Sequence, residues 1–172
     1  MTKIKEQVVL SLDQSTTATG WGLFKKGKLT DYGVYKPNGD RDERIEKTRV
    51  WVGNKIEELV KEENIELHLI LEDIQMQRNV ETFKSLAHLQ GVLINLGYQK
   101  TKNNEIDQSA VYYSSAWKST CRVGGKKRAE QKANAHKHVL KTYGVDAPED
   151  ACDAICLGEH HLYQMNSVLN FE

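Results

Sequence analysis

The chain has 172 residues, of which 39% are hydrophobic and 28% are charged, and its formal net charge at pH 7 is zero. A chain of this length is expected to form a single domain that buries roughly 70% of its unfolded surface. It is too short for a second hydrophobic core. Residues 1–7 are too polar for a signal peptide, and no apolar run approaches about 18 residues. The composition therefore predicts an intracellular protein that is neither secreted nor inserted in a membrane.

Strand patterns dominate the first 35 residues. Residues 8–13 form an apolar run, a Ser/Thr-rich turn follows, and residues 20–25 form a second run. Lys26, Gly27 and Lys28 make a hairpin turn into a third strand that continues through Tyr35. Residues 40–63 then carry apolar side chains at helical spacing, which predicts an amphipathic helix.

The second half alternates strands and helices. Residues 67–72 predict a buried strand, and residues 79–96 predict a helix that Asn79 caps and Gly97 ends. A weaker strand ends near Tyr113, residues 114–120 form a short turn, and helices span 128–143 and 148–165, the last beginning at Pro148. The order β-β-β-α-β-α-β-α-α indicates one α/β domain over residues 1–172, a mixed sheet flanked by helices.

Four acidic residues lie at the edges of these elements. Asp13 and Glu72 end strands, while Asp150 and Asp153 share a face in the first turn of the last helix. Like charges about 4 Å apart repel by roughly 4 kcal/mol at an effective dielectric near 20, so a converged set needs a cation. Oxygen ligands select Mg²⁺ or Mn²⁺, and paired ions of this kind hydrolyse phosphodiesters. A metal-dependent nuclease is the first hypothesis, with helix capping and solvated strand ends as the structural alternative.

Positive charge is concentrated in residues 118–141, which hold eight Lys and Arg against Glu130 alone, a local net charge of +7. Such a surface can bind phosphate although the whole chain is neutral. The three cysteines, Cys121, Cys152 and Cys156, are odd in number and lack the spacing of a zinc site, so we interpret them as buried free thiols.

Four blocks of the sequence resemble the RuvC family of Holliday junction resolvases, within the ribonuclease H-like superfamily. The blocks are Leu12-Asp13 with residues 16–22, residues 71–74 with Met76, Asn79 and Gly91, Trp117-Lys118 with Gly124-Gly125, and residues 150–155. Together they span roughly residues 8–163 in the order of the family. The resemblance implies a ribonuclease H-like mixed sheet and cleavage of branched DNA, at four-way junctions and forks.

The resemblance also implies roles for individual residues. Asp13, Glu72, Asp150 and Asp153 would be ligands of two Mg²⁺ ions, for which Mn²⁺ substitutes, and Lys118 would hold the scissile phosphate with one further basic residue. The candidates for DNA contact are Lys118, Lys126, Lys127, Arg128, Lys132 and Gln75. Hydrolysis would proceed in line without a covalent intermediate, and a homodimer would make two symmetric incisions, with the helix 79–96 as its predicted interface.

The chain departs from the family at two places. Gln14 and Ser15 replace a usual Pro-Gly, which we interpret as a turn variant, and Gln75 stands where many members carry an aromatic. Stacking of a base on an aromatic contributes roughly 1 to 3 kcal/mol, which Gln cannot supply, so we predict relaxed sequence preference at the cut site.

Two other functions remain open at this point. The first block also resembles the phosphate-contacting turn of ATP-dependent sugar kinases, but those enzymes need two such domains and this chain has length for one. A non-catalytic junction-binding module is the other alternative, and the retained carboxylates disfavour it because negative charge weakens DNA binding.

Overall fold

The computed structural model describes residues 5–169 of the chain, which form five strands and five helices. The strands are β1 (Glu6–Asp13), β2 (Thr19–Lys25), β3 (Lys28–Tyr35), β4 (Ile65–Glu72) and β5 (Gln108–Tyr112). They pair in the order β3-β2-β1-β4-β5. Neighbours within β1–β3 are antiparallel, whereas β1, β4 and β5 run parallel. The parallel half brings the ends of β1 and β4 to the same edge.

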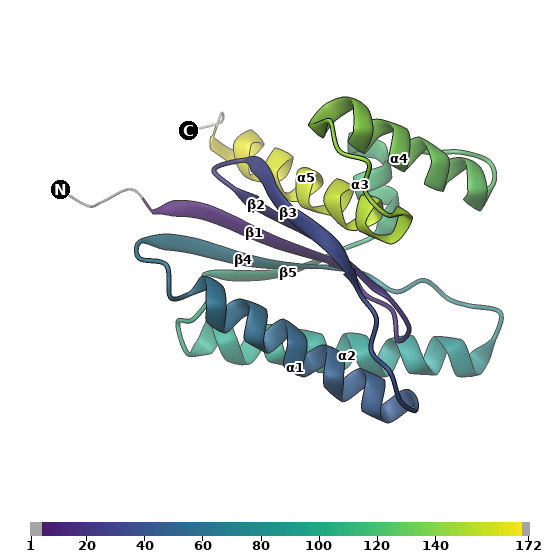
Figure 1. Ribbon diagram of the computed structural model, residues 1–172, viewed down its shortest axis with the longest axis horizontal. Helices are drawn as coiled ribbons and strands as arrows, with labels where there is room; N and C mark the ends of the chain where they lie inside the picture. The colour runs from purple at the N-terminus through teal and green to yellow at the C-terminus, as the bar shows by residue number, and fades with distance from the viewer. Residues whose placement is uncertain (1–4, 170–172) are drawn as a thin grey trace.

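Helices cover both faces of this sheet (Figure 1). On one face lie α1 (Arg41–Leu59) and α2 (Val80–Lys102). On the other lie α3 (Ser114–Cys121), α4 (Arg128–Tyr143) and α5 (Glu149–Leu169). Figure 1 shows α5 lying along the strands, with α3 and α4 packed against it. The two faces hold two separate hydrophobic clusters.

The alternation of side chains along β1 assigns its residues to these two clusters. Val8, Leu10 and Leu12 belong to the cluster beneath α1 and α2, whereas Val9 belongs to the cluster beneath α3–α5. Because side chains alternate with a period of two, Asp13 projects on the same face as Val9. The strand pattern thereby directs this carboxylate toward the α3–α5 face.

The predicted fold class is confirmed, with one added helix and several shifted boundaries. Residues 114–120, predicted as a turn, belong to α3. The predicted stop at Gly97 is wrong, because α2 continues to Lys102. Gly97 is buried where α2 meets β5, and a Cβ atom there would approach Ser109 Oγ to within 2.4 Å. The residue is a glycine because of this close packing rather than because the helix ends.

Smaller differences concern helix ends. The helix predicted over 40–63 ends at Leu59, and Asp40 and Glu43 form a capping box at its start. The last helix begins at Glu149, with the Pro148 carbonyl accepting the Cys152 N–H at 3.0 Å. No helix within residues 5–169 combines the length and the apolar character needed to cross a membrane.

Candidate active site

The ends of β1 and β4 bring two carboxylates together. Leu12 pairs with Leu71 in the parallel register, so Asp13 and Glu72, the next residue of each strand, are neighbours at the sheet edge. The Glu72 side chain points toward α3, because its Oε2 accepts a hydrogen bond of 2.9 Å from Trp117 Nε1. The two strand-end carboxylates thus face the same side of the sheet, as their sequence positions predicted.

The first turn of α5 adds the other two carboxylates. It lies directly on β2, where a Cβ atom on Gly20 would sit 1.8 Å from the Asp150 carbonyl oxygen. Any side chain at position 20 would therefore push α5 away from the sheet. Asp13, Glu72, Asp150 and Asp153, which we call the carboxylate set, all line one cavity of about 520 Å³. The structure brings together the four acidic residues that the sequence singled out.

Burial and mutual repulsion act on the protonation of this set. Burial, followed by the charges of Glu72 and Asp153, raises the pKa of Asp13 well above its usual value. Burial raises the pKa of Glu72 to about 7, although the Trp117 hydrogen bond opposes the shift. Burial also raises the pKa of Asp153. Full ionisation of the set near neutral pH therefore needs a compensating positive charge.

Lys132 of α4 supplies part of that charge. Its Nζ lies 3.2 Å from Glu149, 3.5 Å from Asp150 and 3.8 Å from Asp153. Burial lowers the pKa of Lys132, but these carboxylates outweigh burial and the net shift is upward. The Lys132 ammonium thus offsets part of the negative charge at the start of α5.

The donor chemistry of the cavity fits a hard divalent cation. Besides four carboxylates, the cavity is lined by Gln14, whose Oε1 is the one buried side-chain oxygen or nitrogen of the described residues without a hydrogen-bond partner. Its Nε2 donates to the Glu72 carbonyl at 2.5 Å, which holds the amide in place. Within residues 5–169, no three of the carboxylates have oxygen atoms mutually within 4.8 Å, so the set surrounds the cavity rather than closing on one point. Oxygen donors in this arrangement are those that Mg²⁺ and Mn²⁺ prefer.

The predicted DNA-contact residues divide into two groups. Lys118, Arg128, Lys132 and Gln75 line the same cavity as the carboxylate set. Lys126 and Lys127 are exposed and lie outside the cavity lining. Gln75 donates its side-chain amide to Ser114 Oγ at the cavity wall. Of the three candidates for a second phosphate-binding residue beside Lys118, Arg128 and Lys132 line the cavity and Lys127 does not.

Sequence reasoning missed two residues of this site. From sequence, Gln14 is interpreted as a turn variant, and Trp117 enters only as part of the Trp117-Lys118 block. Trp117 is 2% exposed, yet its indole N–H binds Glu72. For Gln14 the adjacency to Asp13 was the available signal, whereas nothing in the sequence joins Trp117 to Glu72, 45 residues earlier.

Known proteins resemble this chain over most of its length. No protein-family model matches it. It is 27% identical over 169 residues to the crossover junction endodeoxyribonuclease RuvC of Fusobacterium nucleatum, covering 95% of this chain and 84% of that protein. It is 25% identical over 175 residues to RuvC of Dictyoglomus turgidum, covering 91% and 97%. The chain is thus similar to two RuvC endonucleases over nearly its whole length.

Solved structures agree with this relationship. The structure of Thermus thermophilus RuvC in complex with a Holliday junction substrate superposes with a TM-score of 0.69 at 15% identity, covering 93% of this chain and 96% of that one. The yeast mitochondrial Holliday junction resolvase superposes with a TM-score of 0.61 at 12% identity, covering 99% and 85%. The resemblance to RuvC drawn from the four sequence blocks is confirmed, and so is the ribonuclease H-like fold.

Proposed function

We propose that this RuvC relative is a metal-dependent endonuclease that cleaves four-way DNA junctions. The observation that carries the proposal is the convergence of the carboxylate set with Lys118, Arg128 and Lys132 on one cavity. Acidic residues that hold cations and basic residues that hold phosphate are the two parts that phosphodiester hydrolysis needs. Both curated relatives are named crossover junction endodeoxyribonucleases, which supports the same reaction.

The cation we propose is Mg²⁺, with Mn²⁺ as a substitute and two ions in each site. When bound, such ions activate water and stabilise the charge on the leaving oxygen. Asp13, Glu72, Asp150 and Asp153 would hold them, and the Gln14 amide oxygen is a further donor at the same wall. The Trp117 indole orients Glu72 and favours its ionised form.

The basic residues have separate roles in this proposal. The Lys118 charge acts on both Glu72 and Asp153, which puts it beside the carboxylate set and suits it to the scissile phosphate. Lys132 neutralises the α5 carboxylates in the metal-free protein. Asp150 and Asp153 would hold cations in the loaded protein, and Lys132 would then be free to contact a DNA phosphate. Arg128 lines the same cavity and extends the phosphate-binding surface.

We further propose a two-fold homodimer, since one chain offers one cutting site and a four-way junction needs two incisions. On α2, the predicted interface helix, Leu89 and Leu93 are fully buried in the core, whereas Phe83 and Leu86 are partly exposed. Apolar side chains that do remain exposed on and before this helix are Met76, Val80, Ile94 and Tyr98. Relaxed sequence preference stays part of the proposal, because Gln75 offers no ring on which a base could stack.

The test compares a labelled four-way junction, a fork and a linear duplex, each with and without Mg²⁺. We expect that the junction is cleaved only when the metal is present and that the duplex is cleaved little. Junction binding without cleavage at any Mg²⁺ or Mn²⁺ concentration would favour the binding module instead. ATP hydrolysis stimulated by a sugar would favour the kinase alternative, which the near full-length similarity to RuvC disfavours.

A further inference from the structure

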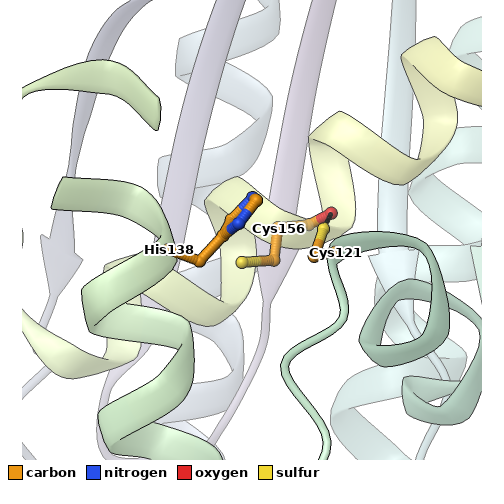
Figure 2. Close-up of side chains that lie close together, drawn as sticks. All are labelled: Cys121, His138 and Cys156. Atoms are coloured by element: carbon orange, nitrogen blue, oxygen red, sulfur yellow. Dashed lines mark hydrogen bonds between the residues drawn. The ribbon is translucent and has the colours of Figure 1, made fainter. Parts of the chain in front are cut away.

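Away from the carboxylate set, three helices bring two cysteines and a histidine together. Cys121 is the last residue of α3, His138 lies in α4 and Cys156 lies in α5 (Figure 2). One ligand atom from each residue, the two Sγ atoms and a ring nitrogen, lies within 4.8 Å of the other two. Within residues 5–169 no other group of three or more His, Cys, Asp or Glu side chains has this property.

We propose that Cys121, His138 and Cys156 form a zinc-binding site. Two thiolates and an imidazole are soft and borderline donors of the kind that select zinc over Mg²⁺. Because zinc–sulfur bonds are about 2.3 Å long and the ion is tetrahedral, two sulfurs on one ion are about 3.8 Å apart. The observed limit of 4.8 Å means that small side-chain movements bring all three donors to bonding distance.

The surroundings of His138 match those of a metal-bound histidine. Its Nε2 lies 2.8 Å from Glu159 Oε2, which also accepts a hydrogen bond of 2.9 Å from the Tyr143 hydroxyl. With Nε2–H donating to this carboxylate, Nδ1 is the nitrogen left to bind an ion. A carboxylate that orients a ligating histidine through its other nitrogen is a usual partner in metal sites. A water molecule would complete the four-coordinate geometry that zinc prefers.

Buried cysteines without a metal are common, and the chain contains such a case for comparison. Cys152 is as buried as Cys156 and lies on the same helix, and its thiol donates to the Ala147 carbonyl at 3.4 Å much as the Cys121 thiol donates to the Cys156 carbonyl at 3.5 Å. It is not part of the three-residue group. Cys121 and Cys156 differ from it in facing each other and an imidazole across three helices. Cys152 is therefore the matched control for the proposed ligands.

The position of the site suggests what the ion would do. Cys121 lies three residues after Lys118, and Cys156 lies three residues after Asp153. His138 lies on the helix that carries Lys132. One ion bound to all three would fix the relative positions of the helices that carry residues of the carboxylate cavity. The zinc site itself does not depend on nuclease activity, since metal content and spectrum report it directly.

The first experiment loads the purified full-length chain with zinc under reducing conditions, removes unbound metal by gel filtration and measures zinc by mass spectrometry. The expected result is one tightly held ion per chain, retained in Cys152→Ser and in His136→Gln, the neighbouring histidine of α4. The Cys121→Ser/Cys156→Ser variant and His138→Gln should each lose the ion. Glu159→Gln should weaken zinc affinity by about 10- to 100-fold.

The second experiment uses Co²⁺ as a spectroscopic probe on the unmodified chain, so it stands even if a cysteine variant fails to fold. Cobalt bound by Cys121 and Cys156 gives a thiolate-to-metal charge-transfer band, whereas cobalt held by carboxylates does not. A wild-type chain that retains no more zinc than the double variant, or a cobalt spectrum without that band, overturns the proposal. So does a Cys121–Cys156 disulfide in the zinc-treated chain, because its sulfurs could not serve as thiolate ligands.

Discussion

The two faces of the sheet differ in the chemistry that they bury. Beneath α1 and α2 the core consists of apolar side chains such as Leu10 and Leu69, packed from β1, β4 and the two helices. Beneath α3–α5 the apolar core is mixed with buried polar groups, among them Ser11 and His161. Polar groups cost free energy when buried unless they find partners. The α1–α2 face also buries Thr48 and Gln90, which bond to the Arg44 carbonyl and to Asp73, but the hydrogen bonds on the α3–α5 face are more numerous and join different elements.

The partners on the α3–α5 face are specific. Ser11 Oγ donates to the Ala154 carbonyl at 2.7 Å, and His161 bridges His68 at 2.8 Å and the Tyr112 hydroxyl at 2.9 Å. Burial lowers the pKa of His161 to about 4, so the His161 imidazole remains neutral at physiological pH. Both faces bury apolar side chains, but only the α3–α5 face also holds the carboxylate set at its edge.

The largest expected effect is a loss of stability caused by a change in the core beneath α1 and α2. Leu69→Ala removes a fully buried side chain and leaves a cavity, so the free energy of unfolding should fall by about 2 to 5 kcal/mol. Junction cleavage by the fraction that remains folded should keep its rate. Urea denaturation measures the loss, with the half-exposed Ile94→Ala as the control that should change stability little. A Leu69→Ala protein with parental stability would refute the assignment of this face.

The second largest effect is expected from the loss of the hydrogen bond between Trp117 and Glu72 on the α3–α5 face. Trp117→Phe keeps most of the packing but removes the N–H that binds Glu72, a hydrogen bond to a charged group that contributes about 1.5 to 3 kcal/mol. Because this bond lowers the pKa of Glu72, the midpoint of the pH–rate profile should move to higher pH. Trp51→Phe, a change at the Tyr35 stack on the far face, should leave that profile unmoved. Identical profiles for both variants would remove Trp117 from the site.

A third prediction separates the basic residues within the α3–α5 face. Arg128→Ala with Lys132→Ala should slow cleavage of fully bound junction by about tenfold, because a barrier change near 1.4 kcal/mol is expected for lost phosphate positioning. Lys126→Ala with Lys127→Ala should leave that rate unchanged, although each lost phosphate contact lowers the log–log salt slope by roughly 0.9. Single-turnover rates at saturating protein decide between them. Equal cleavage rates for the two double variants would mean that Arg128 and Lys132 do not position the phosphate, although they line the cavity.

The smallest expected effect concerns pH and metal. A carboxyl group with a raised folded pKa stabilises the fold fully below its unfolded value and loses that stabilisation as pH rises through the folded one. For Glu72 the window runs from about 4.5 to about 7. Melting temperatures in EDTA should therefore fall across this window, and Mg²⁺ at several times its Kd should restore about 1 kcal/mol above pH 7. A melting curve that Mg²⁺ leaves unchanged at pH 8 would argue against a cation site.

Sequence pattern predicted the parts of the molecule that depend on local order. The apolar runs of β1 and β4 placed Asp13 and Glu72 at strand ends, which the parallel pairing brings to one edge of the sheet. The three-residue spacing of Asp150 and Asp153 placed them on one helix face. The stop at Gly97 was misjudged because a glycine chosen for close packing looks the same in sequence as one chosen for a positive φ.

Features that arise from tertiary packing could not be predicted in this way. The convergence of Cys121, His138 and Cys156 depends on how three helices pack, so the spacing of these residues in the sequence does not predict it. The bond from Trp117 to Glu72 joins a helix to a strand end in the same manner. For Lys132 the sequence supplied the charge but not its ion pairs with the α5 carboxylates. Local periodicity therefore predicts where a residue lies on its strand or helix. The partners of buried polar groups can be identified only from the folded structure.

The most direct test of the central claim is the cleavage of a labelled four-way junction by the parent chain and by Asp153→Asn at saturating Mg²⁺, with binding measured on the same preparations. The account predicts that the parent cleaves and that Asp153→Asn loses cleavage by more than about a hundredfold, a barrier change near 2.7 kcal/mol, while binding the junction at least as well. Asp31→Asn, which changes an exposed carboxylate on β3, should cleave normally. Cleavage by Asp153→Asn within about tenfold of the parent would contradict the assignment of the carboxylate set as the catalytic centre.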